Sequence, residues 1–182
     1  DGRVAAVATS LAGRGKVAEE ANGLVLMPGL IDSHLHLGSV FGSAYGQRMA
    51  ALAGVTACLD MAGPFTDILG TIPYAGAGIN VASIEGVSPD ALFGTLSPTR
   101  GEIRSWLEKT VEAGSVGVKL MGGHWPLPLE TCRNVVEIAN EMGVYVAWHA
   151  GSTTAGSNIE GMREVIAAVK GLTLHLAHSH AS

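Results

Sequence analysis

Short apolar runs alternate with amphipathic stretches along most of this chain. Six apolar runs predict β-strands, and they begin near Ile31, Val55, Ile79, Val116, Val144 and Leu172. Patterns with helical spacing separate them at residues 47–53, 66–74, 99–113, 129–142 and 158–169. Strands that alternate with helices in this way predict an α/β fold with a parallel sheet and right-handed crossovers.

Local signals mark the ends of several of these helices. Thr99 and Glu102 form a capping-box pattern directly after Pro98, so the third helix should begin there. Gly54, Gly114 and Gly143 each follow an apolar helical pattern, as glycines at helix C-termini do. These signals support the alternation of strands and helices independently of hydropathy.

The first 27 residues differ from the rest. Residues 3–7 and 23–27 read as two short strands, and the polar stretch 13–22 joins them. A Pro-Gly pair at residues 28–29 then turns the chain into the first strand of the alternating region. We therefore divide the chain into a segment at 1–27 and a domain at 28–182.

Composition narrows the class of protein. The 182 residues are 47% apolar and 15% charged, the net charge is −5, and no basic cluster is present. These features disfavour nucleic acid and anionic membranes as partners. No apolar run reaches the ~20 residues needed to cross a bilayer, and the first residues lack a signal-peptide pattern, so a cytoplasmic protein is expected. Cys58 and Cys132 are expected to be buried, reduced thiols.

The most informative motif is PGLIDSHLH at residues 28–36. His34 and His36 stand two residues apart on a predicted strand, so both imidazoles point to the same face and can reach one cation. With its preceding residues, the motif resembles the signature of the amidohydrolase superfamily, which includes hydantoinase, dihydroorotase, prolidase and N-acyl-amino-acid deacylase types. The resemblance implies a (β/α)8 TIM-barrel fold. Only about six βα units are visible here, so the expected fold is an incomplete barrel, with residues 1–27 as part of a small β-sandwich.

Further chemistry-bearing side chains stand at the ends of later strands. Lys119, His149 and His178 each close an apolar run, and carboxyl ends of barrel strands are where such folds keep their active sites. Strict alternation puts His178 on the face of Leu174 and Leu176. It puts His175 on the opposite face, toward the helices. We choose His178 as the candidate ligand, while His175 and His180 remain alternatives.

The order His-x-His, Lys, His, His resembles the binuclear branch of the superfamily. It implies that His34, His36, Lys119, His149 and His178 bind two divalent cations, for which zinc is expected. Lys119 lies in an apolar run, where burial would lower its pKa and favour reaction with carbon dioxide. The resulting carboxylated lysine would bridge the two metals. The alternative is an unmodified lysine whose amine extends from the end of the strand to solvent.

The resemblance implies hydrolysis of a non-peptide C–N bond, in an amide or cyclic amide of small size. A mononuclear deaminase is one alternative, and an inactive or scaffold form is another. The family also uses an aspartate at the end of an eighth strand, which none of the six predicted strands supplies, so the catalytic residue stays unassigned.

Several other polar residues are candidates of lower specificity. His124 and Trp125, in the loop at 122–128, and His180 are placed where they could contact substrate. Asp60 could orient a metal ligand or cap a turn, with neither reading favoured. Asp32 faces away from the histidine pair and is expected to be a structural hydrogen-bond acceptor. The sheet edges of six strands predict self-association.

Overall fold

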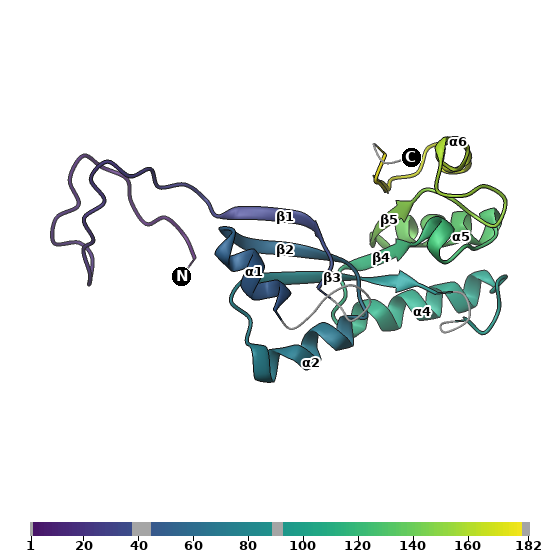
Figure 1. The fold of residues 1–182 in the computed structure, drawn as a ribbon, viewed down its shortest axis with the longest axis horizontal. Helices are drawn as coiled ribbons and strands as arrows, with labels where there is room; N and C mark the ends of the chain where they lie inside the picture. The colour runs from purple at the N-terminus through teal and green to yellow at the C-terminus, as the bar shows by residue number, and fades with distance from the viewer. Residues whose placement is uncertain (1, 38–44, 89–92, 180–182) are drawn as a thin grey trace.

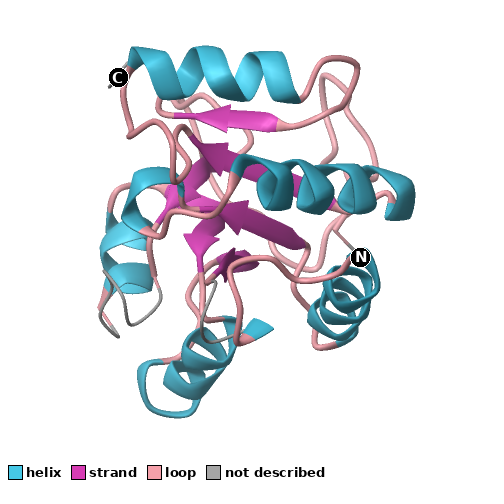
Figure 2. Ribbon diagram, turned by 90° about the vertical axis from the view of Figure 1, so that its right-hand side faces the viewer, coloured by secondary structure: helices cyan, strands magenta, loops and turns pink. Residues whose placement is uncertain are grey.

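The computed structural model describes residues 2–37, 45–88 and 93–179, and its centre is one sheet of six parallel strands. The strands are paired in chain order, as β1-β2-β3-β4-β5-β6. Their bounds are Leu30–Leu35 (β1), Val55–Ala62 (β2), Asn80–Val87 (β3), Gly117–Leu120 (β4), Tyr145–His149 (β5) and His175–Ala177 (β6). The sheet curls, and the helices line its outer side (Figure 2). This arrangement confirms the predicted incomplete α/β barrel.

The helices follow the strands at the predicted places (Figure 1). Their bounds are Gly46–Leu52 (α1), Phe65–Ala75 (α2), Arg100–Glu112 (α4), Leu129–Met142 (α5) and Ile159–Ala168 (α6), with a short 3-10 helix at Gly122–His124 (η1). The predicted capping box starts α4, because the Glu102 amide donates to the Thr99 hydroxyl and the Thr99 amide donates to the Glu102 carboxylate. Gly143 ends α5 with φ 68°, a conformation that favours glycine. No described helix is both long and apolar enough to cross a bilayer.

The main hydrophobic core lies between the outer face of the sheet and the helices. Val118, Leu120, Val146 and Trp148 turn outward from β4 and β5 and pack with buried residues of α4, α5 and α6. Because side chains alternate along a strand, the residues between them face the inside of the curl. The inner face carries its own small cluster, made of Met61, Ile84 and Ala147 with Leu59. Lys119 and His149 therefore belong to the inner face.

A second outer cluster fixes the beginning of the sheet. Leu37, Cys58 and Ile68 are buried together, and Leu35 packs against them. Leu35 separates His34 from His36, so its outward packing turns both imidazoles inward. Both cysteines are buried and free, as predicted.

The segment before β1 differs from its prediction. Residues 2–29 contain no strand, and Val4 and Val25 are 83% and 85% exposed. The chain here leads away from the sheet (Figure 1). The strands predicted at 3–7 and 23–27 are therefore wrong for this structure, because a strand needs a hydrogen-bonded neighbour and the described residues provide none. The assignment of this segment to a β-sandwich stays a prediction.

The last strand is shorter than predicted. The apolar run starts at Leu172, but β6 begins only at His175. The Asn140 side chain explains the delay, because its amide donates to the Thr173 carbonyl and its carbonyl accepts from the Thr173 amide, at 2.8 and 2.7 Å. These bonds hold Thr173 to α5 instead of to β5.

Candidate metal centre

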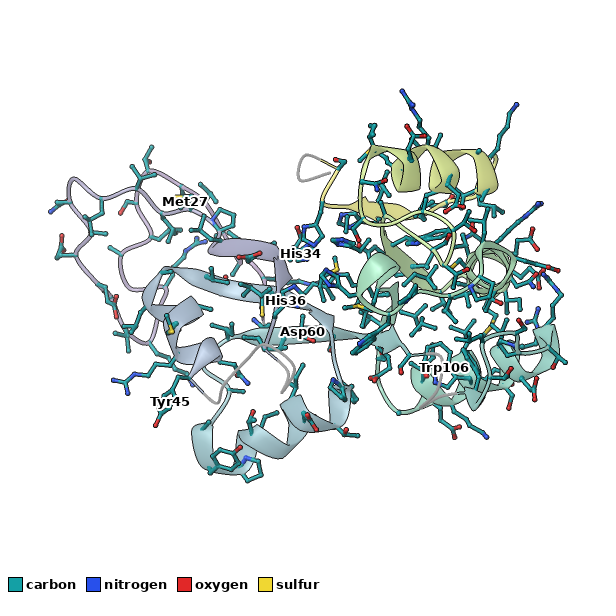
Figure 3. All side chains as sticks on the ribbon, turned by 45° about the vertical axis from the view of Figure 1, so that its right-hand side comes forward. Met27, His34, His36, Tyr45, Asp60 and Trp106 are labelled. Atoms are coloured by element: carbon teal, nitrogen blue, oxygen red, sulfur yellow. The ribbon has the colours of Figure 1, made fainter. Side chains whose placement is uncertain are left out.

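Four imidazoles and one amine meet on the inner face, at the carboxyl ends of the strands. Ring centroids are 5.3 Å apart for His34 and His36, 4.5 Å for His34 and His178, and 4.8 Å for His149 and His178. Lys119 Nζ lies 3.4 Å from His34 Nε2. The structure thus brings together all five residues proposed as ligands, from β1, β4, β5 and the end of β6. His34 and His36 are labelled in Figure 3. Their role as ligands stays a prediction.

The backbone at the histidine pair is held by β1 and by the side chain of Asp32. Asp32 Oδ1 accepts a hydrogen bond from the His34 amide at 3.0 Å. Asp32 therefore has the structural role expected for it.

Lys119 is the buried cation of this site. It is 2% exposed, and Nζ donates to the Met61 carbonyl at 3.2 Å. Burial lowers the pKa of Lys119 to about 8, although the negative charge of Asp60 opposes this shift. The amine is therefore neutral in an appreciable fraction of molecules near neutral pH.

The imidazoles are also biased toward the neutral form. Burial, followed by the charge of Lys119, lowers the pKa of His34 to about 4. Burial and then His178 lower the pKa of His149 to about 4. Burial lowers the pKa of His36 as well. Neutral imidazole is the form that binds metals, so His34, His36 and His149 are in the metal-binding protonation state at pH 7.

The end of β6 corrects the predicted orientation of His175 and shows why His178 faces inward. Leu176 packs in the outer core, so His175 faces inward, with its ring 6.4 Å from that of His34. The prediction that His175 faces the helices is wrong. His178 follows the end of the strand with φ 59°, a left-handed conformation, and this turn carries its ring back to the inner face. Alternation alone would have pointed His178 outward.

Sequence reasoning also missed a partner of His175. The Tyr145 hydroxyl lies 2.5 Å from His175 Nδ1. Tyr145 shares the inner face of β5 with His149, a signal that period-2 alternation contained. The pair lies at the inner edge of the candidate site, beside His34.

Of the three residues proposed to contact substrate, the structure places His124 beside the candidate site. The His124 ring is 4.9 Å from that of His149, and η1 holds it there. A Cβ on Gly122 would lie 2.2 Å from the His149 carbonyl, so glycine permits this close approach. Trp125 follows and is half-buried, while His180 lies outside the described residues. Contact of these three residues with substrate stays a prediction.

The donor set fits a divalent transition metal in its chemistry. Imidazole nitrogens are preferred ligands of zinc. A neutral lysine amine that reacts with carbon dioxide becomes a carbamate, which offers oxygen ligands. Among the residues that the structure describes, no three His, Cys, Asp or Glu side chains are arranged so that they could hold an ion. The rings are gathered at one place without being oriented as a coordination shell.

Comparison with known proteins agrees with this fold and motif. No family model matches the chain. It is 31% identical over 165 residues to a dihydroorotase of Geobacter metallireducens, covering 84% of this chain and 38% of that protein. It is 32% identical over 173 residues to an allantoinase of Solibacter usitatus, covering 87% of this chain and 36% of that protein. The chain thus spans under two fifths of the length of these curated relatives.

A solved structure shares the architecture. The N-acyl-D-glutamate deacylase of Bordetella bronchiseptica, complexed with zinc and a phosphonate inhibitor, aligns with a TM-score of 0.57 at 19% identity. The alignment covers 79% of this chain and 38% of that one. The chain is thus part of a barrel with an imidazole-rich centre at the carboxyl ends of its strands. It belongs to the amidohydrolase superfamily.

The depressed histidine pKa values predict acid sensitivity of the metal-free chain. The folded-state pKa values of His34 and His149, about 4, lie below the ordinary value of 6.5. Between these values the unfolded chain binds more protons, so the free energy of unfolding should fall as pH falls from 6.5 toward 4. Urea unfolding in the presence of a chelator, at several pH values from 7 to 5, measures this slope. A His149→Asn variant should show a shallower slope, and equal slopes would contradict the buried, neutral state of His149.

Proposed function

We propose that this chain carries the greater part of the binuclear metal centre of a hydrolase that cleaves a C–N bond in an amide or cyclic amide. The observation that carries the proposal is the convergence of His34, His36, Lys119, His149 and His178 on one inner face. The names dihydroorotase, allantoinase and N-acyl-D-glutamate deacylase among the relatives and structural neighbours support this class of small-molecule substrate.

Each residue has a role in this proposal. His34 and His36 would hold one divalent ion, and His149 and His178 would hold the other. The neutral Nζ of Lys119 would form a bond with the carbon of carbon dioxide and release one proton, and the two oxygens of the resulting carbamate would be available to the ions. Burial supports this step, because it favours the amine over the ammonium ion.

Two bound ions, for which zinc is expected, would acidify a water molecule and polarise the substrate carbonyl. The chain's own residues prepare the site for them. Burial keeps the imidazoles of His34 and His149 neutral and raises the fraction of Lys119 that is neutral. The short helix η1 holds His124 beside His149, where it can meet a substrate entering over the loop. Trp125 and His180 are the further proposed substrate contacts.

Zinc titration of the metal-free chain tests the proposal. The chain is stripped with a chelator, supplied with bicarbonate, and titrated by calorimetry, with bound metal counted by mass spectrometry. Two ions per chain support the binuclear centre. A His34→Asn/His36→Asn double variant should lose at least one of them, while the control His124→Asn should keep both.

The other outcomes count against the proposal. One ion per chain, with Lys119 unmodified, would favour the mononuclear deaminase. Absence of tight binding would favour an inactive or scaffold form.

A further inference from the structure

Asp60 is almost fully buried at the carboxyl end of β2. It is 1% exposed and stands between Leu35 of β1 and Ser83 of β3 in the strand register. Figure 3 shows it beside the end of β1, near His36. A buried carboxylate is costly unless its oxygens are hydrogen-bonded, so its partners indicate its purpose.

The Asp60 carboxylate joins three segments. Oδ1 accepts from the Leu37 amide at 2.5 Å. Oδ2 accepts from the Gly63 amide at 2.9 Å and from the Ser83 hydroxyl at 3.0 Å. The carboxylate thus ties the chain after β1 to the turn after β2 and to β3. The turn-capping reading of Asp60 is therefore correct, and the Leu37 bond adds to it.

The bond to Leu37 matters for the histidine pair. The ladder of β1 ends at Leu35, so His36 lies beyond the strand's own hydrogen bonds with β2. Leu37 follows directly, and its side chain is packed with Cys58 and Ile68. Asp60 therefore fixes the backbone on the far side of His36, while β1 fixes the near side.

The charge of Asp60 acts on the same group of residues. It raises the pKa of His36 and of Lys119, against the effect of burial on both. This negative charge is in place before any cation enters the site.

We propose that Asp60 is a positioning residue of the metal centre, which holds the backbone at His36 and Leu37 and supplies a fixed negative charge beneath the ligands. The part of this inference that is tested by zinc affinity rests on the proposed function. Its structural part, the tie between Asp60 and Leu37, can be tested without metal.

The test compares Asp60→Asn with Ser83→Ala. Asparagine keeps the size but removes the charge and replaces one acceptor oxygen by an NH2 group, which cannot accept from Leu37, Gly63 or Ser83. Ser83→Ala is the matched control, because it removes one bond to the same carboxylate on the side away from His36. We expect zinc affinity to fall about 10- to 100-fold in Asp60→Asn, as for other residues that orient ligands, and to change less than twofold in Ser83→Ala.

Two readouts separate positioning from general stability. The visible spectrum of the cobalt-substituted chain should change in Asp60→Asn and not in Ser83→Ala. In the metal-free chain, hydrogen exchange at the Leu37 amide should be at least tenfold faster in Asp60→Asn than in wild type. Wild-type affinity and spectrum in Asp60→Asn would overturn the proposal.

The remaining outcomes are also decisive. If the wild-type chain binds no zinc, the proposed function fails, and unchanged Leu37 exchange in Asp60→Asn would then overturn the positioning role as well. If Asp60→Asn does not fold, Asp60→Glu takes its place. It keeps the charge but moves the oxygens outward by one methylene. Wild-type zinc affinity and Leu37 exchange in Asp60→Glu would overturn the proposal.

Discussion

Replacing Lys119 with methionine is expected to reduce the zinc content of the chain from two ions to one. Methionine is of similar length and suits a site that is 2% exposed, but it offers no amine to carboxylate. The bridging oxygens would be lost, whereas the His34 and His36 pair would remain. The weaker-bound ion should therefore lose at least 100-fold in affinity, a larger effect than the loss of a residue that only orients a ligand. Metal counting and calorimetry measure both ions.

A second measurement follows the modification itself. Chain prepared in 13C-bicarbonate should give a carbamate carbon signal that Lys119→Met lacks. Lys109→Met, at an exposed position of α4, is the matched control and should keep the signal and both ions. Two tightly bound ions in a chain whose Lys119 is unmodified would contradict the bridging role.

Trp148→Ala is expected to cause the largest loss of stability. Trp148 is 0% exposed in the main core, and its Nε1 donates to the Gly151 carbonyl at 3.2 Å. Truncation should lower the free energy of unfolding by about 3–5 kcal/mol, because it removes buried apolar surface and leaves a cavity. Zinc affinity should fall too, since Trp148 precedes His149 and anchors the turn that follows it.

Urea denaturation of the metal-free chain measures the stability change. Ile166→Ala provides the control, because Ile166 is 58% exposed on α6 and should change the free energy by less than about 0.5 kcal/mol. A loss below about 1.5 kcal/mol for Trp148→Ala would mean that the outer face of β5 is not packed as described.

Local pattern was enough to predict much of this structure. The six strands, the helices between them and the capping box at Thr99 all follow from apolar periodicity and short-range chemistry, which act within a few residues. The same is true of His34 and His36, because a spacing of two on a strand decides their common face. Lys119 and His149 follow in the same way, as the inward neighbours of outward-packed core residues.

Other features needed the tertiary structure. Residues 3–7 and 23–27 have the apolar character of strands, but a strand forms only where a neighbour supplies hydrogen bonds, and such a neighbour is distant in sequence. Self-association through the sheet edges stays a prediction for the same reason, because it depends on what covers those edges.

In the candidate site, too, some features follow from the sequence and others only from the tertiary structure. The sequence alone determined which residue types end the strands and that the side chains of the first two histidines lie on the same face. Only the tertiary structure decided that His178 turns inward, because this depends on a left-handed backbone after β6 that strand periodicity does not encode. It also decided the protonation of Lys119 and the three bonds of Asp60, since burial and long-range hydrogen bonds arise only when separate strands are assembled into one sheet.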